Sequence, residues 1–171
     1  MTRLPSGFVA HVCNVGIKDA TDDLVVVVAE PAAASSAVFT RSTFAGASVV
    51  LSREHATRAT TRAMVIISKN SNVATGAQGE ANAREVVTSV ARRLGCSPDE
   101  VLIASTGVIG RQYPMNRLRA GLAALPATFS NVDASAVARA MMTTDTVEKV
   151  ASAGIAGSSG KIGRASCRER V

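Results

Sequence analysis

The order of strand-like and helix-like segments predicts an α/β fold, a layered sandwich of mixed β-sheets flanked by helices. Apolar segments rich in β-branched residues come early in the chain, and amphipathic helical patterns come late. No GxGxxG motif follows a strand-like segment, which argues against a doubly wound nucleotide-binding fold. Because 47% of the residues are apolar and only 3% are aromatic, the core must consist mainly of Ala, Val, Leu and Ile.

Several segments have the composition or the alternation of β-strands. Residues 8–15 alternate apolar with polar or small side chains, as a half-buried strand does, and His11 is expected there as a structural residue. Residues 24–29 form a continuous β-branched run, typical of a strand covered on both faces. A hairpin of these two strands is the simplest pairing. Further strands are predicted at residues 36–40, 47–52, 63–68 and 101–104.

The clearest helix is predicted over residues 80–94. Gly95 follows it as a C-terminal stop, and the apolar residues recur at helical spacing along one face: Ala83, Val86, Val87, Val90 and Leu94. Residues 114–125 are expected to form the next helix, with a proline in its first turn, and residues 134–141 another.

The charge of the chain lacks the pattern of a nucleic-acid-binding protein. Lys and Arg number 19 against 13 Asp and Glu, a net charge of +6, but the arginines are scattered and no aromatic residues are interleaved with them. No apolar run is long enough to span a bilayer, and the N-terminus lacks a signal-peptide pattern. We therefore expect a cytoplasmic protein that binds neither nucleic acid nor membrane.

The chain has few of the side chains that bind metals or take part in redox chemistry. The chain has 3 cysteines without a CxxC pair, and 2 histidines. We expect neither a disulfide framework nor a metal site.

The stretch at residues 101–113 carries the most specific functional signal. After a short apolar strand, the sequence Ser-Thr-Gly-Val-Ile-Gly introduces hydroxyls and glycines. A glycine lets its backbone N–H turn into a cavity, and a neighbouring threonine hydroxyl can add a second donor toward the same point. We predict Thr106 and Gly107 as catalytic residues that form an oxyanion hole for an acyl-transfer intermediate. The alternative is a plain strand-to-loop turn.

Two further features leave alternatives open. Residues 69–79 form a polar loop ahead of the predicted helix, where Asn72 and Thr75 can either cap the helix or help to shape a ligand site. Arg41 follows the predicted strand at residues 36–40. It is either an exposed loop residue or a ligand for a carboxylate, which a guanidinium binds through two parallel hydrogen bonds.

Several motifs of the chain resemble those of the ornithine acetyltransferases, also called glutamate N-acetyltransferases. The resemblance runs from about residue 7 to about residue 150. The motifs are Ser-Thr-Gly-Val-Ile-Gly with the following Pro114-Met115, Ala-Val-Phe-Thr at 37–40, Asn-Ser-Asn-Val-Ala-Thr-Gly at 70–76, and Met-Thr-Thr-Asp-Thr at 142–146. Residues 36–54 and 110–115 are most similar to the member encoded in clavulanic-acid gene clusters.

The resemblance implies a self-cleaving fold and a defined activity. Family members move an acetyl group from N-acetylornithine to glutamate by double displacement on a threonine, without a cofactor. The resemblance also implies that Thr143, or failing it Thr144, contacts the substrate. It implies as well that a complementary β chain completes an α2β2 heterotetramer. The nucleophilic threonine of the family is absent from this chain.

Residues 1–161 are thus predicted to be the N-terminal, α-chain part of a truncated ornithine acetyltransferase-like domain. Gly157 stands where the family carries a substrate-binding lysine. Residues 162–171 correspond to the translation of a common short-read sequencing adapter, so we expect a non-native tail there. Two alternatives to acetyl transfer are an amidohydrolase on the same scaffold, with water as acceptor, and a non-catalytic fragment.

Overall fold

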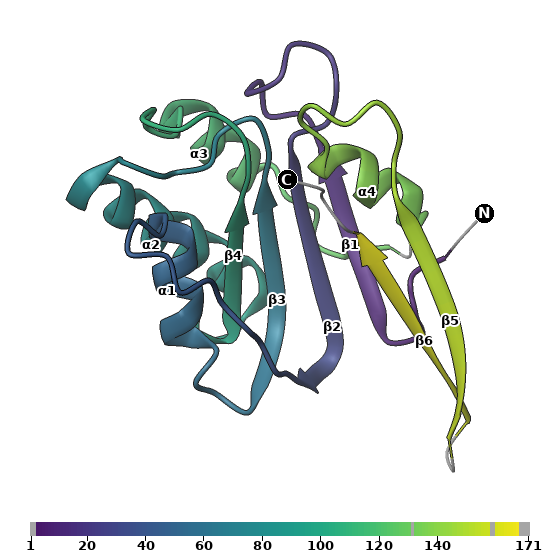
Figure 1. Ribbon diagram of the computed structural model, residues 1–171. Coiled ribbons are helices and arrows are strands. Elements are labelled where there is room, and N and C mark those ends of the chain that lie inside the picture. Colours follow the sequence, from purple (N-terminus) through teal and green to yellow (C-terminus); the bar gives the residue numbers. More distant parts are fainter. Residues whose placement is uncertain (1–2, 131, 158–159, 168–171) are drawn as a thin grey trace.

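The computed structural model describes residues 3–130, 132–157 and 160–167. Its main sheet has four strands in the order β1-β2-β3-β4, formed by Phe8–Cys13, Leu24–Ala34, Thr60–Ile67 and Val101–Ser105. The helices are α1 (Ala47–His55), α2 (Gly76–Leu94), α3 (Met115–Ala123) and α4 (Ala134–Met141), with a 3-10 turn at Pro98–Glu100. Helices α1 to α3 lie on one side of the sheet and α4 on the other (Figure 1). The predicted α/β class is confirmed.

The sheet is mixed, as predicted. β1 and β2 form an antiparallel hairpin in which Phe8 pairs with Ala29 and Cys13 with Leu24, so the expected hairpin is confirmed. β2 and β3 are also antiparallel, whereas β3 and β4 are parallel and are connected through α2. The ends of β3 and β4 therefore lie side by side at one edge of the sheet.

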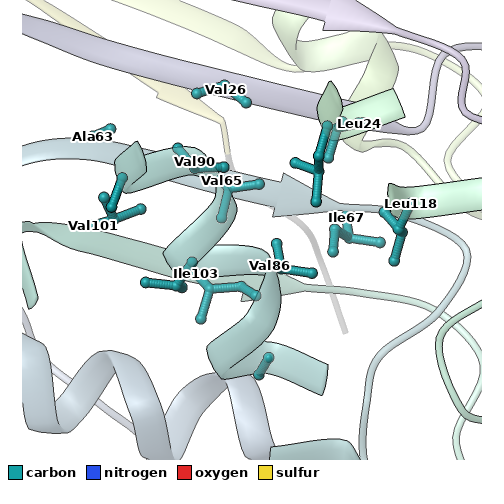
Figure 2. Close-up of a cluster of buried hydrophobic side chains, with 14 of the residues drawn as sticks. Leu24, Val26, Ala63, Val65, Ile67, Val86, Val90, Val101, Ile103 and Leu118 are labelled. Atoms are coloured by element: carbon teal, nitrogen blue, oxygen red, sulfur yellow. The ribbon is translucent and has the colours of Figure 1, made fainter. Parts of the chain in front are cut away.

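The main core lies between the sheet and helices α2 and α3 (Figure 2). Alternate residues of β2, β3 and β4 point into it, while Val25 and Val27 of β2 and Ile66 of β3 pack with residues of α4, as the two-residue period of a strand requires. Burial on both faces explains the continuous β-branched run of β2. The side chains on the α2 and α3 side include Leu24, Val26, Val65, Ile67, Val86, Val90, Ile103 and Leu118.

Residues 47–52 form the start of helix α1, so the strand predicted there is wrong. The β-branched pair at 49–50 favoured a strand, but tertiary contacts outweigh that weak local preference. Polar side chains of α1 cover the outer edge of β4. The Ser52 hydroxyl donates to the Ile103 carbonyl at 2.6 Å and accepts from the Ile103 N–H at 2.7 Å, and His55 Nδ1 lies 2.8 Å from the Val101 carbonyl. Backbone groups of Val101 and Ile103 at the edge of the sheet thereby have hydrogen-bond partners.

Other element boundaries also differ from the predictions. Residues 36–40 are irregular, so the strand predicted there is wrong; Val38 is 98% exposed and therefore has no packing to stabilise a strand. The preceding strand β2 extends to Ala34 through a register shift between Val28 and Ala33. Helix α2 begins at Gly76, ahead of the predicted residue 80, and ends as expected before Gly95, whose φ is 66°. The predicted helices at 114–125 and 134–141 are confirmed as α3 and α4.

The C-terminal part of the described chain is a hairpin of β5 (Val150–Gly157) and β6 (Gly160–Cys167). β6 includes the beginning of the predicted non-native tail, and residues 168–171 of that tail lie outside the described residues. Of the helices in the described ranges, none is long and apolar enough to cross a membrane.

His11 is a structural residue of β1, as predicted. It pairs with Val26 of β2, and its ring meets the Phe129 ring edge-on at 6.2 Å between centroids. Burial lowers the pKa of His11 below its ordinary value of 6.5, with Asp22 acting weakly in the opposite direction.

The lowered pKa of His11 predicts a loss of stability in acid. As the pH falls through about 6.5, the unfolded chain binds a proton at His11 before the folded protein does, so the unfolded state is favoured. Urea unfolding between pH 7.5 and 5.5 should therefore show a smaller decrease in unfolding free energy for His11→Gln than for the parent protein. Equal decreases would contradict this assignment.

Candidate active site

An open cleft of about 1210 Å³ lies where the C-terminal ends of β3 and β4 meet the end of α4. All four residues predicted for the site, Thr106, Gly107, Thr143 and Thr144, line this cleft. They come from two segments that are distant in sequence: the break after β4 and the loop after α4. Loop 14–23, between β1 and β2, lines the cleft with Lys18, Asp19, Ala20, Thr21 and Asp22.

Backbone hydrogen bonds set the path of the chain at Thr106 and Gly107. The N–H of Thr106 donates to the Ile67 carbonyl at 3.0 Å, and the N–H of Val108 donates to the Lys69 carbonyl at 3.0 Å. Between them, the N–H of Gly107 donates to no acceptor among the described residues. The end of β3 and the residue Lys69 therefore bind the two neighbouring amides, and Gly107 between them lines the cleft.

Gly107 has a backbone that other residues do not adopt readily, with φ at 126°. A Cβ atom at this position would lie 2.3 Å from the Lys69 carbonyl carbon and 2.5 Å from its oxygen. The glycine is therefore required both for its φ angle and for the close approach of the two loops. Lys69 itself has a positive φ of 71°, and Asn72 and Ala74 follow with 51° and 57°. Strained residues of this kind gather at functional sites.

Charged side chains of both signs surround the cleft. Lys18 Nζ donates to the Ala140 carbonyl at 2.9 Å and so ties loop 14–23 to the C-terminal end of α4, where a cation is favoured. Arg139 pairs with Glu148 at 3.1 Å, and Lys69 pairs with Asp19 at 3.3 Å. Because the Asp19 side chain is 98% exposed, the second pair is weak and leaves the Lys69 amine able to meet a ligand.

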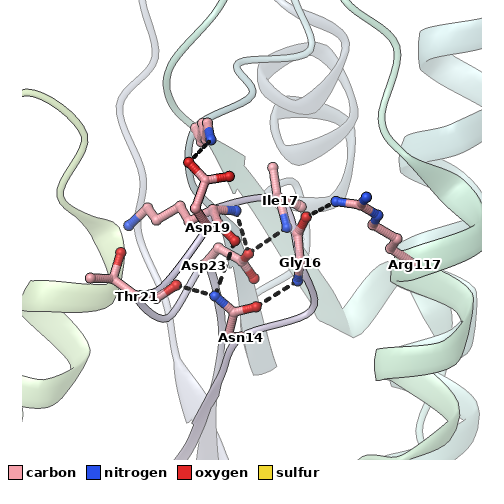
Figure 3. Close-up of polar contacts among 9 residues, drawn as sticks. Asn14, Gly16, Ile17, Asp19, Thr21, Asp23 and Arg117 are labelled. Atoms are coloured by element: carbon pink, nitrogen blue, oxygen red, sulfur yellow. Dashed lines mark hydrogen bonds and ion pairs between the residues drawn. The ribbon is translucent and has the colours of Figure 1, made fainter.

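Asp23 organises loop 14–23 from within (Figure 3). It is fully buried, and its carboxylate accepts hydrogen bonds from the backbone N–H groups of Val15, Ile17 and Lys18 at 2.8, 2.6 and 2.8 Å. Asn14 closes the same loop, since its Oδ1 accepts from the Gly16 N–H at 2.7 Å. This wall of the cleft therefore depends on one buried carboxylate.

Asp23→Asn should lower the free energy of unfolding by about 2–3 kcal/mol. The amide replaces one acceptor oxygen by an NH2 group, which cannot accept the hydrogen bonds that the backbone N–H groups of the loop donate to Asp23. Chemical denaturation measures this difference. Asp22→Asn is the matched control: Asp22 is the exposed neighbour, and its substitution should change stability by no more than about 0.5 kcal/mol. An equal effect of the two substitutions would refute the role given to Asp23.

A buried network of amide side chains lies behind the cleft. Asn72 is fully buried, and its Nδ2 donates to the Gly79 carbonyl at 3.0 Å while its Oδ1 accepts from the Thr75 hydroxyl at 2.8 Å. Thr75 is the N-cap of α2, but its side chain makes no capping hydrogen bond. Capping by this hydroxyl is thus excluded. Neither Asn72 nor Thr75 lines the cleft, so any influence on its shape is indirect.

A second polar cluster supports the end of β4. The hydroxyl of Tyr113 hydrogen-bonds to Ser48 Oγ at 2.9 Å and also to Ser105, and the two serine hydroxyls are 2.7 Å apart. Burial raises the pKa of the Tyr113 hydroxyl above its ordinary value of 10. The cluster joins the residue before Thr106 to helix α1. The sequence did not predict it because Ser48 lies 57 residues before Ser105 and 65 residues before Tyr113.

Other residues considered from the sequence lie elsewhere. Arg41 is exposed, and among the described residues that line the cleft none belongs to segment 36–41. Cys13 and Cys96 are free thiols, and burial raises the pKa of Cys13 to about 11. Where the structure describes the chain, no group of three or more His, Cys, Asp or Glu residues is placed to hold a metal ion.

Comparison with known sequences identifies relatives. The profile of the ArgJ family matches residues 9–166. Over 150 residues the chain is 52% identical to glutamate N-acetyltransferase Oat2 of Streptomyces clavuligerus, an alignment that covers 86% of this chain and 38% of that protein. Over 147 residues it is 48% identical to the arginine biosynthesis bifunctional protein ArgJ of Rhodococcoides fascians, covering 85% and 36%. The chain therefore spans little more than a third of the length of these curated relatives.

Solved structures share the fold. The arginine biosynthesis bifunctional protein ArgJ of Bacillus halodurans matches with a TM-score of 0.90 and 27% identity, over 99% of this chain and 93% of that chain. Ornithine acetyltransferase of Mycobacterium tuberculosis, solved with ornithine, matches with a TM-score of 0.84 and 30% identity, over 98% and 90%. The predicted resemblance is confirmed, and the identity with Oat2 agrees with the similarity expected to a clavulanic-acid-cluster member. The chain belongs to the ArgJ family.

Proposed function

We propose that this chain is the N-terminal part of an acetyltransferase that moves an acetyl group from N-acetylornithine to glutamate. The observation that supports this most directly is that Thr106, Gly107, Thr143 and Thr144 line one cleft. The relatives named as glutamate N-acetyltransferase and ornithine acetyltransferase support the reaction and its substrates.

The proposed reaction is a double displacement on a threonine outside this chain. The threonine oxygen attacks the acetyl carbonyl of N-acetylornithine, the C–N bond breaks, and ornithine leaves with a proton on its amine. The amine of glutamate then attacks the threonine ester, which forms N-acetylglutamate and returns the proton to the threonine oxygen. In both steps the carbonyl oxygen becomes negatively charged, and the Thr106 hydroxyl and Gly107 N–H are proposed to stabilise that charge. The acetyl group stays on the enzyme between the steps, so no cofactor is required.

In this proposal Thr143, or failing it Thr144, contacts the substrate. The two threonines follow α4 and line the same cleft as Gly107. A ligand with both an amino and a carboxylate group matches the mixed charges around them, which include Lys69 and Asp145.

We further propose that a complementary β chain supplies the nucleophile, in an α2β2 assembly. In the two solved structures the matched chain is itself about as long as this one, although the curated relatives are much longer. Mass spectrometry of the complete gene product should find two chains, the second beginning with threonine. A single uncleaved chain would contradict the proposed β chain.

The complete gene product, read through to its natural stop codon, provides the test. Incubation with N-acetylornithine and glutamate should yield N-acetylglutamate and ornithine in equal amounts, measured by NMR. Release of free acetate without N-acetylglutamate would instead indicate an amidohydrolase, and no turnover would indicate a non-catalytic protein. The genomic sequence after codon 161 tests the proposed adapter origin of residues 162–171, which requires those codons to be missing from the genome.

A further inference from the structure

Asn70 contacts the segment of Thr106 and Gly107 in two ways. Its backbone forms β-bridges with Thr106 and with Val108. Its side chain reaches further along the same segment, where Nδ2 donates to the carbonyl oxygens of Arg111 at 3.2 Å and Gln112 at 3.0 Å. One residue therefore holds both the start and the end of loop 106–112.

Both the NH2 group and the carbonyl oxygen of the Asn70 side chain make hydrogen bonds. Its two N–H groups serve the two carbonyls, and its Oδ1 accepts from the Asn72 N–H at 2.9 Å. The residue is only 5% exposed, so water does not replace these partners readily. A carboxylate of the same size has no hydrogen to donate, and a hydroxyl has a single O–H donor. The site is thus specific for an amide side chain.

Asn70 is not among the residues that line the cleft. It directly follows Lys69, which has a φ of 71° and whose carbonyl accepts from the Val108 N–H. Oxyanion donors act only when they are held within about 0.5 Å of the productive position. A residue that fixes the loop at both ends is suited to supply that precision.

We propose that Asn70 is a positioning residue, which holds loop 106–112 so that the Gly107 N–H and Thr106 stay aimed at the reacting oxygen. This inference rests on the proposed function. It assigns to Asn70 an effect on the transition state and not on substrate binding.

The test compares Asn70→Asp with the parent in the complete gene product. We expect kcat for acetyl transfer to fall by about 10–100-fold, because misplaced oxyanion donors lose part of their contribution. The KM for N-acetylornithine should stay within about twofold, since an effect confined to the transition state leaves ground-state binding unchanged. Val90→Ala, which truncates a buried side chain of α2, is the matched control: it should lower the melting temperature without changing kcat well below that temperature.

The outcomes separate the inference from the function on which it rests. A parent protein without acetyl transfer overturns the proposed function, and with it the catalytic role of Asn70. An active parent with an unchanged kcat in Asn70→Asp overturns the inference alone, as does a rise in KM at constant kcat. Asn70→Ala, which introduces no charge, repeats the measurement if the Asp variant does not fold. If neither folds while Val90→Ala does, Asn70 serves folding only and the inference is wrong.

Discussion

Replacing Gly107 by alanine is expected to lower the rate of acetyl transfer by about 10³-fold, the upper range for loss of an oxyanion donor. The added Cβ would lie 2.3 Å from the Lys69 carbonyl carbon, where no side-chain rotation relieves the clash, because the neighbour is backbone. The two loops must therefore separate, and the φ of 126° must change at the same time. Steady-state kinetics of the complete gene product measure the effect.

Gly110→Ala is the matched control for this experiment. Gly110 lies in the same loop and also has a positive φ, 77°, but a Cβ there would meet no atom within 4 Å. The Gly110→Ala variant should therefore have only the backbone strain of about 1 kcal/mol and retain most of the activity. If Gly107→Ala transfers acetyl as fast as Gly110→Ala, the close approach to Lys69 has no role in the site.

Thr106→Ala should reduce kcat by about 10²–10³-fold, or about 3–4 kcal/mol, with little change in KM. The physical reason is that the hydroxyl is proposed to bind the oxygen only when it becomes negatively charged. Thr106→Ser keeps the hydroxyl and should recover most of the lost rate. Parallel measurements of kcat and KM for the three proteins decide this point. An alanine variant as fast as the parent would remove Thr106 from the oxyanion hole.

Together the two variants examine the two proposed donors separately. Thr106→Ala removes a side-chain group and leaves the Gly107 backbone in place, whereas Gly107→Ala displaces the backbone. A large effect of the second with none of the first would assign the oxyanion to the amide alone. Asp23→Asn, in contrast, acts on the wall of the cleft formed by loop 14–23 and should change stability before it changes kcat.

Sequence patterns predicted the elements whose residues interact mainly with their neighbours along the chain. The helical spacing from Ala83 to Leu94 located most of α2, and the alternation around His11 located β1. The same patterns failed at residues 47–52. There the β-branched residues favoured a strand, but Ser52 and His55 bind the edge of β4 and stabilise a helix instead. That contact joins residues more than 40 positions apart, which no local pattern records.

In the candidate site, too, local sequence predicted some features and long-range contacts decided the others. By itself, the amino-acid sequence indicated the break after the fourth strand, because Ser-Thr-Gly after an apolar run has a local chemical meaning at Thr106 and Gly107. The family resemblance implied a substrate contact at Thr143, but only the tertiary structure showed that this residue lines the same cleft. The tertiary structure alone placed Lys69 against Gly107 and directed the Asn70 amide to the far end of the loop. The reason is physical: strand, turn and helix preferences act over a few residues, whereas a cleft is made by hydrogen bonds and packing between segments that only the folded chain brings together.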